Sequence, residues 1–187
     1  MMTHTAYQKA DIKFTYDDYV LLPEDKRYEL IGGDLIMTPA PLTTHQRVSQ
    51  NINNSLWSFV KDRELGKVLY APVDVVFSEE DVVQPDILFI AKDRLGILTE
   101  KNVKGAPDLV IEILSLSNAK MDLVIKKKLY AKFGVREYWI VHPDEKSVEV
   151  MTWAEKGFKT VQVYLHNTLL RSPLLRDFSM PVNEIFL

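Results

Sequence analysis

A carboxylate in the middle of an aliphatic strand constrains this chain more than any other feature. The segment APDLVIEIL, residues 106–114, has the apolar composition of a buried strand, and Glu112 lies in it between Ile111 and Ile113. Burying a carboxylate is costly unless it is paired or bound to a cation. Glu112 therefore has either a buried Arg or Lys as its partner or a place in a metal site.

A second acid stands in a comparable position. We expect one strand from Val83 to Ala91, with Asp86 near its start, and another from Asp108 to Leu114. If the two strands are neighbours, Asp86 and Glu112 can reach one cation, and Mg²⁺ prefers such carboxylate oxygens. The alternative for Asp86 is a turn-forming role after Pro85.

Catalysis at such a metal site would also need a positively charged side chain beside the two acids. Leu114 shares a strand face with Glu112 but carries no ammonium, so the nearest source is the helix expected at residues 122–133. In that helix Lys126 follows Asp122 by one turn, and packing on the sheet could direct it toward the carboxylates. The alternative is an exposed salt bridge between Lys126 and Asp122.

The sequence predicts a role in the site less strongly for three other side chains. Lys127 and Lys128 are expected to form a solvated helix face, with phosphate contact as the second interpretation. Asp74 follows Pro72 on a strand that leads toward the expected site, where it could support the other groups.

The periodicities predict a mixed α/β fold. Apolar residues repeat at helical spacing between Thr43 or Thr44 and about Glu64. The Gly32-Gly33 pair predicts an N-terminal hairpin, and antiparallel strands are expected near the C-terminus. The unit from Asp108 to Glu137 is long enough to join parallel strands through a helix. We expect a mixed central sheet flanked by helices, in a single domain spanning residues 1–187.

Composition excludes several classes of protein. The chain has no cysteine, which rules out disulfides and thiolate metal sites. Its apolar runs are too short to span a membrane, and the N-terminus lacks an apolar signal core, so a cytoplasmic location without membrane contact is expected. A formal net charge of −3 argues against a nucleic-acid coat protein but is compatible with an enzyme that has a local basic groove.

Four stretches carry a resemblance to a known family. They are YELIGGDLIMTPAP, then HQRVS from His45, then PVDVVFSEEDVVQPDILFI, then PDLVIEILSLSNAKMDLVIKKKLYAKFGVREYWIVHP. Together and in this order they resemble the Uma-two family of restriction-endonuclease-like proteins, within the PD-(D/E)XK nuclease superfamily. The resemblance covers roughly two thirds of the chain, which is more specific than any single motif.

The resemblance implies a restriction-endonuclease-like fold and metal-dependent cleavage of nucleic acid. By position it implies that Asp86 and Glu112 bind the metal, that Ile113 adds its backbone carbonyl, and that Lys126 is the catalytic lysine. Glu29 and His45 match family positions that would lie at the rim of the site.

Two functions from different classes follow. The first is an endonuclease that uses Mg²⁺ or Mn²⁺ to hydrolyse phosphodiester bonds in DNA, working as a homodimer. The second is a catalytically silent nuclease fold that binds nucleic acid or a protein partner. Leu114 in place of the usual lysine favours the second, and no base-reading element separates DNA from RNA.

Overall fold

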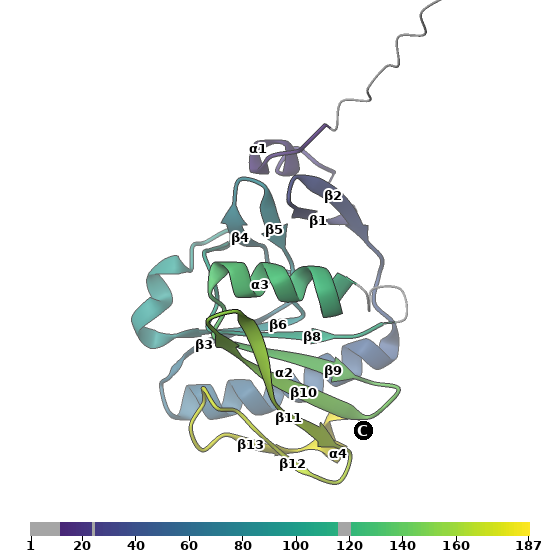
Figure 1. Ribbon diagram of the computed structural model, residues 1–187, viewed down its shortest axis with the longest axis vertical. Helices are drawn as coiled ribbons and strands as arrows, with labels where there is room; N and C mark the ends of the chain where they lie inside the picture. Colours follow the sequence, from purple (N-terminus) through teal and green to yellow (C-terminus); the bar gives the residue numbers. More distant parts are fainter. Residues whose placement is uncertain (1–11, 24, 116–120) are drawn as a thin grey trace, which may run out of the picture.

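A six-stranded sheet lies at the centre of the architecture (Figure 1). The computed structural model describes residues 12–23, 25–115 and 121–187. Along the chain the elements are α1 (Tyr16–Tyr19), β1 (Arg27–Ile31), β2 (Asp34–Thr38), α2 (Thr43–Asp62), β3 (Gly66–Tyr70), β4 (Val75–Ser78), β5 (Asp81–Val83), β6 (Ile87–Ala91), the 3-10 helix η1 (Lys92–Ile97), β7 (Val103–Lys104), β8 (Leu109–Ile113), the π-helix η2 (Met121–Lys126), α3 (Lys127–Phe133), β9 (Glu137–His142), β10 (Ser147–Ala154), β11 (Gly157–Leu165), β12 (Leu169–Arg171), β13 (Ser179–Pro181) and α4 (Val182–Ile185).

The central sheet is mixed, as the sequence predicted. Its strands follow the order β11-β10-β9-β8-β6-β3. Strand β8 is parallel to β9, with Ile111 opposite Trp139, and antiparallel to β6. The chain between β8 and β9 carries η2 and α3, so the expected helical crossover between parallel strands is confirmed.

Helices cover both faces of this sheet (Figure 1). On one face α2 buries the apolar stripe that its sequence predicted. This stripe packs against Trp139 and other residues on that face of the sheet. The buried residues of the stripe are Val48, Ile52, Leu56 and Val60. On the other face α3 packs Leu129 and Tyr130 against Val110 and Ile140. Side chains alternate along β8, so Glu112 lies on the same face as Val110, beneath α3.

A five-stranded sheet in the order β2-β1-β5-β4-β7 adjoins the central one, and β12 pairs with β13. The expectation of one strand from Val83 to Ala91 is therefore wrong. Strand β5 ends at Val83 in the five-stranded sheet, and β6 begins at Ile87 in the central sheet. Pro85 lies in the break, where its missing N–H cannot continue a strand ladder. Asp86 consequently lies just before β6, where the chain enters the central sheet.

Smaller differences concern the ends of elements. Helix α2 begins at Thr43 with Leu42 as its N-cap, so no threonine side chain caps it. The first half of the helix expected at residues 122–133 is the π-helix η2, and Gly134 ends α3 at a φ of 80° as expected. Residues 116–120, which precede this helix in the sequence and which the sequence predicted as a polar connection, lie outside the described part of the chain. None of the described helices is long and apolar enough to cross a membrane.

Candidate functional site

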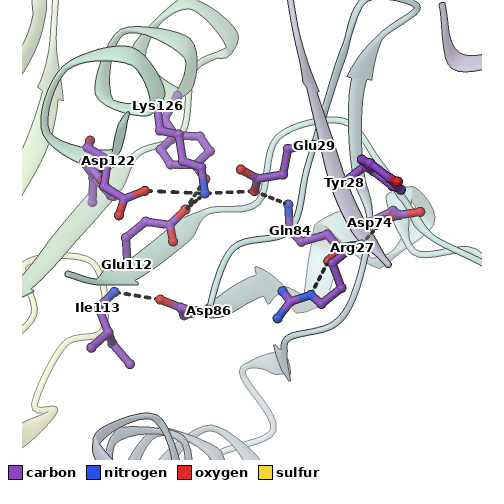
Figure 2. A network of polar contacts seen from close by, with 12 residues as sticks. Arg27, Tyr28, Glu29, Asp74, Gln84, Asp86, Glu112, Ile113, Asp122 and Lys126 are labelled. Carbon is purple, nitrogen blue, oxygen red and sulfur yellow. Dashed lines mark hydrogen bonds and ion pairs between the residues drawn. The ribbon is translucent and has the colours of Figure 1, made fainter. Parts of the chain in front are cut away.

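The candidate site is a cavity of about 210 Å³ where the two larger sheets meet. Its walls come from β1, the start of α2, the break before β6, the end of β8 and the π-helix η2. Six ionisable side chains on these walls carry the argument: Glu29, His45, Asp86, Glu112, Asp122 and Lys126. Figure 2 shows Glu29, Glu112 and Asp122 converging on the ammonium of Lys126.

The antiparallel pairing of β6 with β8 brings Asp86 close to the end of β8. Ile87 lies opposite Ile111, and Asp86 immediately precedes that pair. The Asp86 Oδ2 atom accepts the N–H of Ile113 at 2.7 Å and lies 3.1 Å from Nε2 of His45. The expectation that the two acid-bearing segments are neighbours is therefore met, and both acids line the same cavity.

Lys126 is the centre of the charge network (Figure 2). Its Nζ lies 2.8 Å from Glu29 Oε1, 3.2 Å from Glu112 Oε1 and 3.5 Å from Asp122 Oδ1. Its side chain is only 7% exposed, so the alternative of an exposed salt bridge with Asp122 is wrong. The hidden basic partner considered for Glu112 is present, and it is the same lysine that the resemblance makes catalytic.

The network holds more negative charge than one ammonium can neutralise. Burial, with the charges of Asp122, Asp86 and Glu29, raises the pKa of Glu112 well above its ordinary value against the opposing effect of Lys126. Burial also raises the pKa of Asp122 to about 6. Burial alone would lower the pKa of Lys126, but the charges of Glu112, Glu29 and Asp122 outweigh it and raise that pKa. The acids around Lys126 therefore favour its ammonium form, whereas burial and mutual repulsion disfavour the ionised forms of Glu112 and Asp122.

His45 faces Asp86 from the first turn of α2. Burial lowers its pKa, but the hydrogen bond to Asp86, the charge of Asp86 and a backbone hydrogen bond to Ile113 together give a net increase. The pKa of His45 therefore lies above its ordinary value, chiefly because of the neighbouring Asp86. The expected place of His45 beside the site agrees with this geometry, while its role stays a prediction.

Two members of the site were missed as functional residues by sequence reasoning. Asp122 was considered only as a partner of Lys126, and the hydroxyl of Tyr130 donates a hydrogen bond to Glu112 Oε1. Asp122, Lys126 and Tyr130 recur every four residues, a spacing that places side chains on one face of a helix. That spacing was the signal that could have identified them together.

Asp74 is not among the residues that line the cavity, but hydrogen bonds connect it to residues that do. It accepts hydrogen bonds from Tyr19 Oη and Gln84 Nε2, both at 2.9 Å. The backbone N–H of Gln84 in turn donates to Glu29 Oε1 at 2.8 Å. Asp74 is thus connected to Glu29 through Gln84, and its supporting role stays a prediction.

Comparison with known proteins places this geometry in a family. The family model Uma2 (Uma-two), described as "Putative restriction endonuclease", matches residues 16–183. The chain belongs to the Uma2 family. The match spans β1, the acid-bearing strands and the helix that carries Lys126, so every element of the site lies inside it.

A solved structure confirms the fold of this Uma2 chain. It is the crystal structure, at 1.96 Å resolution, of a putative nuclease belonging to DUF820 from Anabaena variabilis ATCC 29413. The two chains are 23% identical and superpose with a TM-score of 0.78 over 92% of this chain and 97% of the other. The restriction-endonuclease-like fold expected from the sequence is confirmed. The search of curated proteins gave no significant match.

The donor atoms of the Uma2 site suit a hard divalent cation. Carboxylate oxygens of Asp86 and Glu112, with a backbone carbonyl and waters, are the ligands that Mg²⁺ and Mn²⁺ prefer. The excess of acids also fits such an ion, because added positive charge would relieve the repulsion that suppresses their ionisation. Among the described residues no three His, Asp or Glu side chains are arranged to hold a metal by themselves. A metal here would therefore rely on two acids, the Ile113 carbonyl and water.

Lys127 and Lys128 do not line this cavity. They line a separate hollow on the outer side of α3, together with Trp153. Lys128 is exposed, which agrees with the expected solvated face. Contact between these lysines and a substrate phosphate stays a prediction.

Proposed function

We propose that this Uma2 protein is a metal-dependent endonuclease that hydrolyses phosphodiester bonds in DNA. One observation carries the proposal: Asp86, just before β6, and Glu112, on the neighbouring strand β8, line one cavity in which the Lys126 ammonium lies against Glu112. Two acids can hold a metal ion that assists phosphodiester hydrolysis, and an adjacent ammonium can stabilise the negative charge that develops on the phosphate.

Each residue has a distinct role in this proposal. Asp86, Glu112 and the Ile113 carbonyl would hold Mg²⁺ or Mn²⁺, which supplies Lewis-acid polarisation of a phosphoryl oxygen and a lowered pKa for water. The acids around Lys126 raise its pKa, which favours the ammonium form, and in this role its charge would orient water and stabilise negative charge on the phosphate. Tyr130 fixes Glu112 through its hydroxyl.

Plasmid DNA incubated with Mg²⁺ or Mn²⁺ tests the proposal. The wild-type protein should cleave it, and Asp86→Asn and Glu112→Gln should each lower the rate by roughly a hundredfold or more, since each removes a ligand charge. Asp93→Asn is the matched control, because Asp93 is exposed on η1 away from the cavity. Cleavage that persists in both site variants would overturn the proposal. The same assay with an RNA substrate determines which nucleic acid is preferred.

The second candidate is a catalytically silent module, and one specific observation favours it. Lys126 already pairs with Glu29, Glu112 and Asp122, so the cluster has a resident cation. A buried ion-pair network of this kind can be purely structural. Calorimetric titration discriminates between the two, because binding of Mg²⁺ or Mn²⁺ that depends on Asp86 supports the enzyme, whereas its absence supports the silent module.

We also propose, as expected from the sequence, that the protein is a homodimer and is located in the cytoplasm. Light scattering after size-exclusion chromatography measures the mass in solution, and a mass equal to the 21.6 kDa chain would remove the dimer.

A further inference from the structure

Arg27 is a positively charged residue that lines the cavity. It is not among the site residues predicted from the sequence, and it takes no part in the ion pairs around Lys126. It begins β1 and is half-buried at the cavity. Glu29 follows two residues later, and side chains two apart along a strand point to the same side. Arg27 therefore faces the cavity that Glu29 and Lys126 share.

The guanidinium of Arg27 is held in one orientation by Gln84. Its Nε donates to Gln84 Oε1 at 2.9 Å (Figure 2). The orientation of the Gln84 amide is determined in turn, because its Nε2 donates to the Asp74 carboxylate at 2.9 Å and only the oxygen can then face Arg27. A chain of contacts from Tyr19 through Asp74 and Gln84 thus preorganises the arginine.

The terminal nitrogens of Arg27 have no acidic partner among the described residues. Lys126, which lines the same cavity, is bonded to three acids, and Arg94 and Arg136 both pair with Asp108. Within the described parts of the chain no acid pairs with the terminal amino groups of Arg27, although its cavity is rich in carboxylates, so these donors can bind a ligand. A guanidinium fixed at Nε presents Nη1 and Nη2 as a planar pair of donors, which matches two oxygens of a phosphate.

We propose that Arg27 binds a phosphate group of the nucleic-acid backbone at or beside the bond to be cleaved. The inference rests on the proposed function, since it assigns the substrate contact of the same cavity. The two terminal amino groups of Arg27 bind the phosphate oxygens, while Asp86 and Glu112, which line the same cavity, would hold the metal. Asp74 and Gln84 are then positioning residues for this contact.

Binding of a short fluorescent DNA duplex in Ca²⁺, measured by anisotropy over a range of salt concentrations, tests the contact apart from cleavage. Arg27→Gln should weaken binding by about tenfold or more and reduce the slope of log affinity against log salt by about one. Arg27→Lys should fall between the two, because it keeps the charge but loses the paired donors and the bond to Gln84. Arg171→Gln is the charge-matched control, since Arg171 is exposed on β12 away from the cavity and should bind as the wild type does. Circular dichroism checks that each variant is folded.

The outcomes separate this inference from the proposed function. A wild-type protein that binds DNA through Arg27 but cleaves none with Mg²⁺ supports the contact and overturns the endonuclease. A wild-type protein that cleaves, with Arg27→Gln binding equally well and with the same salt slope, overturns the contact alone. A wild-type protein that neither binds nor cleaves the duplex overturns both.

Discussion

The Nζ atom of Lys126 lies 3.2 Å from Oε1 of Glu112, and both side chains are almost completely buried. The lysine comes from a π-helix and the acid from a central strand, so the contact fixes the helical crossover on the sheet at this point. The same ammonium also bonds to Glu29 of β1, which ties the five-stranded sheet to the central one. The charge cluster is thus part of the architecture as well as the candidate active site.

Lys126→Met should lower the free energy of unfolding by about 3–5 kcal/mol, because it leaves Glu29, Glu112 and Asp122 buried without their cation. Chemical denaturation measures this loss. Mn²⁺ should raise the melting temperature of the variant more than that of the wild type, since the ion replaces the missing positive charge. Lys128→Met is the control, because Lys128 is exposed on the adjoining helix α3 and should change stability little. Equal stability of Lys126→Met and the wild type would show that the ammonium does not hold the cluster together.

The parts of this fold that follow local periodicity could be predicted from the sequence. The helical repeat of Val48, Ile52, Leu56 and Val60 located α2 and its buried face. Glu112 was recognised as exceptional because a carboxylate in an aliphatic strand has few physical explanations. In both cases the residues themselves carry the constraint.

The parts that depend on tertiary contact could not be predicted. Nothing local in VVQPDILFI separates one bent strand from two strands in different sheets, although Pro85 gave a hint. The contact between Glu29 and Lys126 joins residues far apart in the chain and requires the two sheets to be placed first. Strands β12 and β13 have only three residues each, too few for an alternating pattern to be recognised.

Two glycines should differ sharply when replaced by alanine. A Cβ at Gly66 would overlap the carbonyl oxygen of Ile90 on the paired strand β6, and its φ of +152° is itself unfavourable for alanine. Gly134 has a φ of +80°, but no atom lies within 4 Å of an added Cβ. Gly134→Ala should therefore cost about 1 kcal/mol and Gly66→Ala roughly 4 kcal/mol or more. Urea titration measures both, and equal costs would contradict the predicted clash.

Glu137 should make stability depend on pH. Burial raises its pKa, although Ser172, Trp139 and the N–H of Leu174 donate hydrogen bonds that oppose the shift. The folded protein therefore holds the Glu137 proton to a higher pH than the unfolded chain, and this contribution to stability is lost as the pH rises through the folded-state pKa. Glu137→Gln does not titrate, so the stability of the wild type relative to this variant should decrease across that range. The variant itself should be less stable by roughly 1–3 kcal/mol, because one amide oxygen cannot accept all three donors.

Urea titrations of both proteins at several pH values measure that difference. A difference that is constant or increases with pH would contradict the raised pKa. Glu155→Gln is the control, because Glu155 is exposed in the turn between β10 and β11 and should leave the pH dependence unchanged.

Binding of a divalent cation at the Asp86 and Glu112 site should strengthen as the pH rises. Burial and neighbouring acids raise the pKa of Glu112 and bring that of Asp122 to about 6. A metal requires ionised carboxylates, so it competes with these protons, and the competition weakens toward pH 8. Mn²⁺ titrated by calorimetry between about pH 5 and pH 8 should show rising affinity and a heat that changes with the buffer, since protons are released on binding. Asp122→Asn should flatten the dependence near pH 6 while binding persists, because the proposed ligand set consists of Asp86, Glu112 and the Ile113 carbonyl and does not include Asp122. Affinity that does not change with pH, in a protein that does bind Mn²⁺, would place the ion away from this cluster.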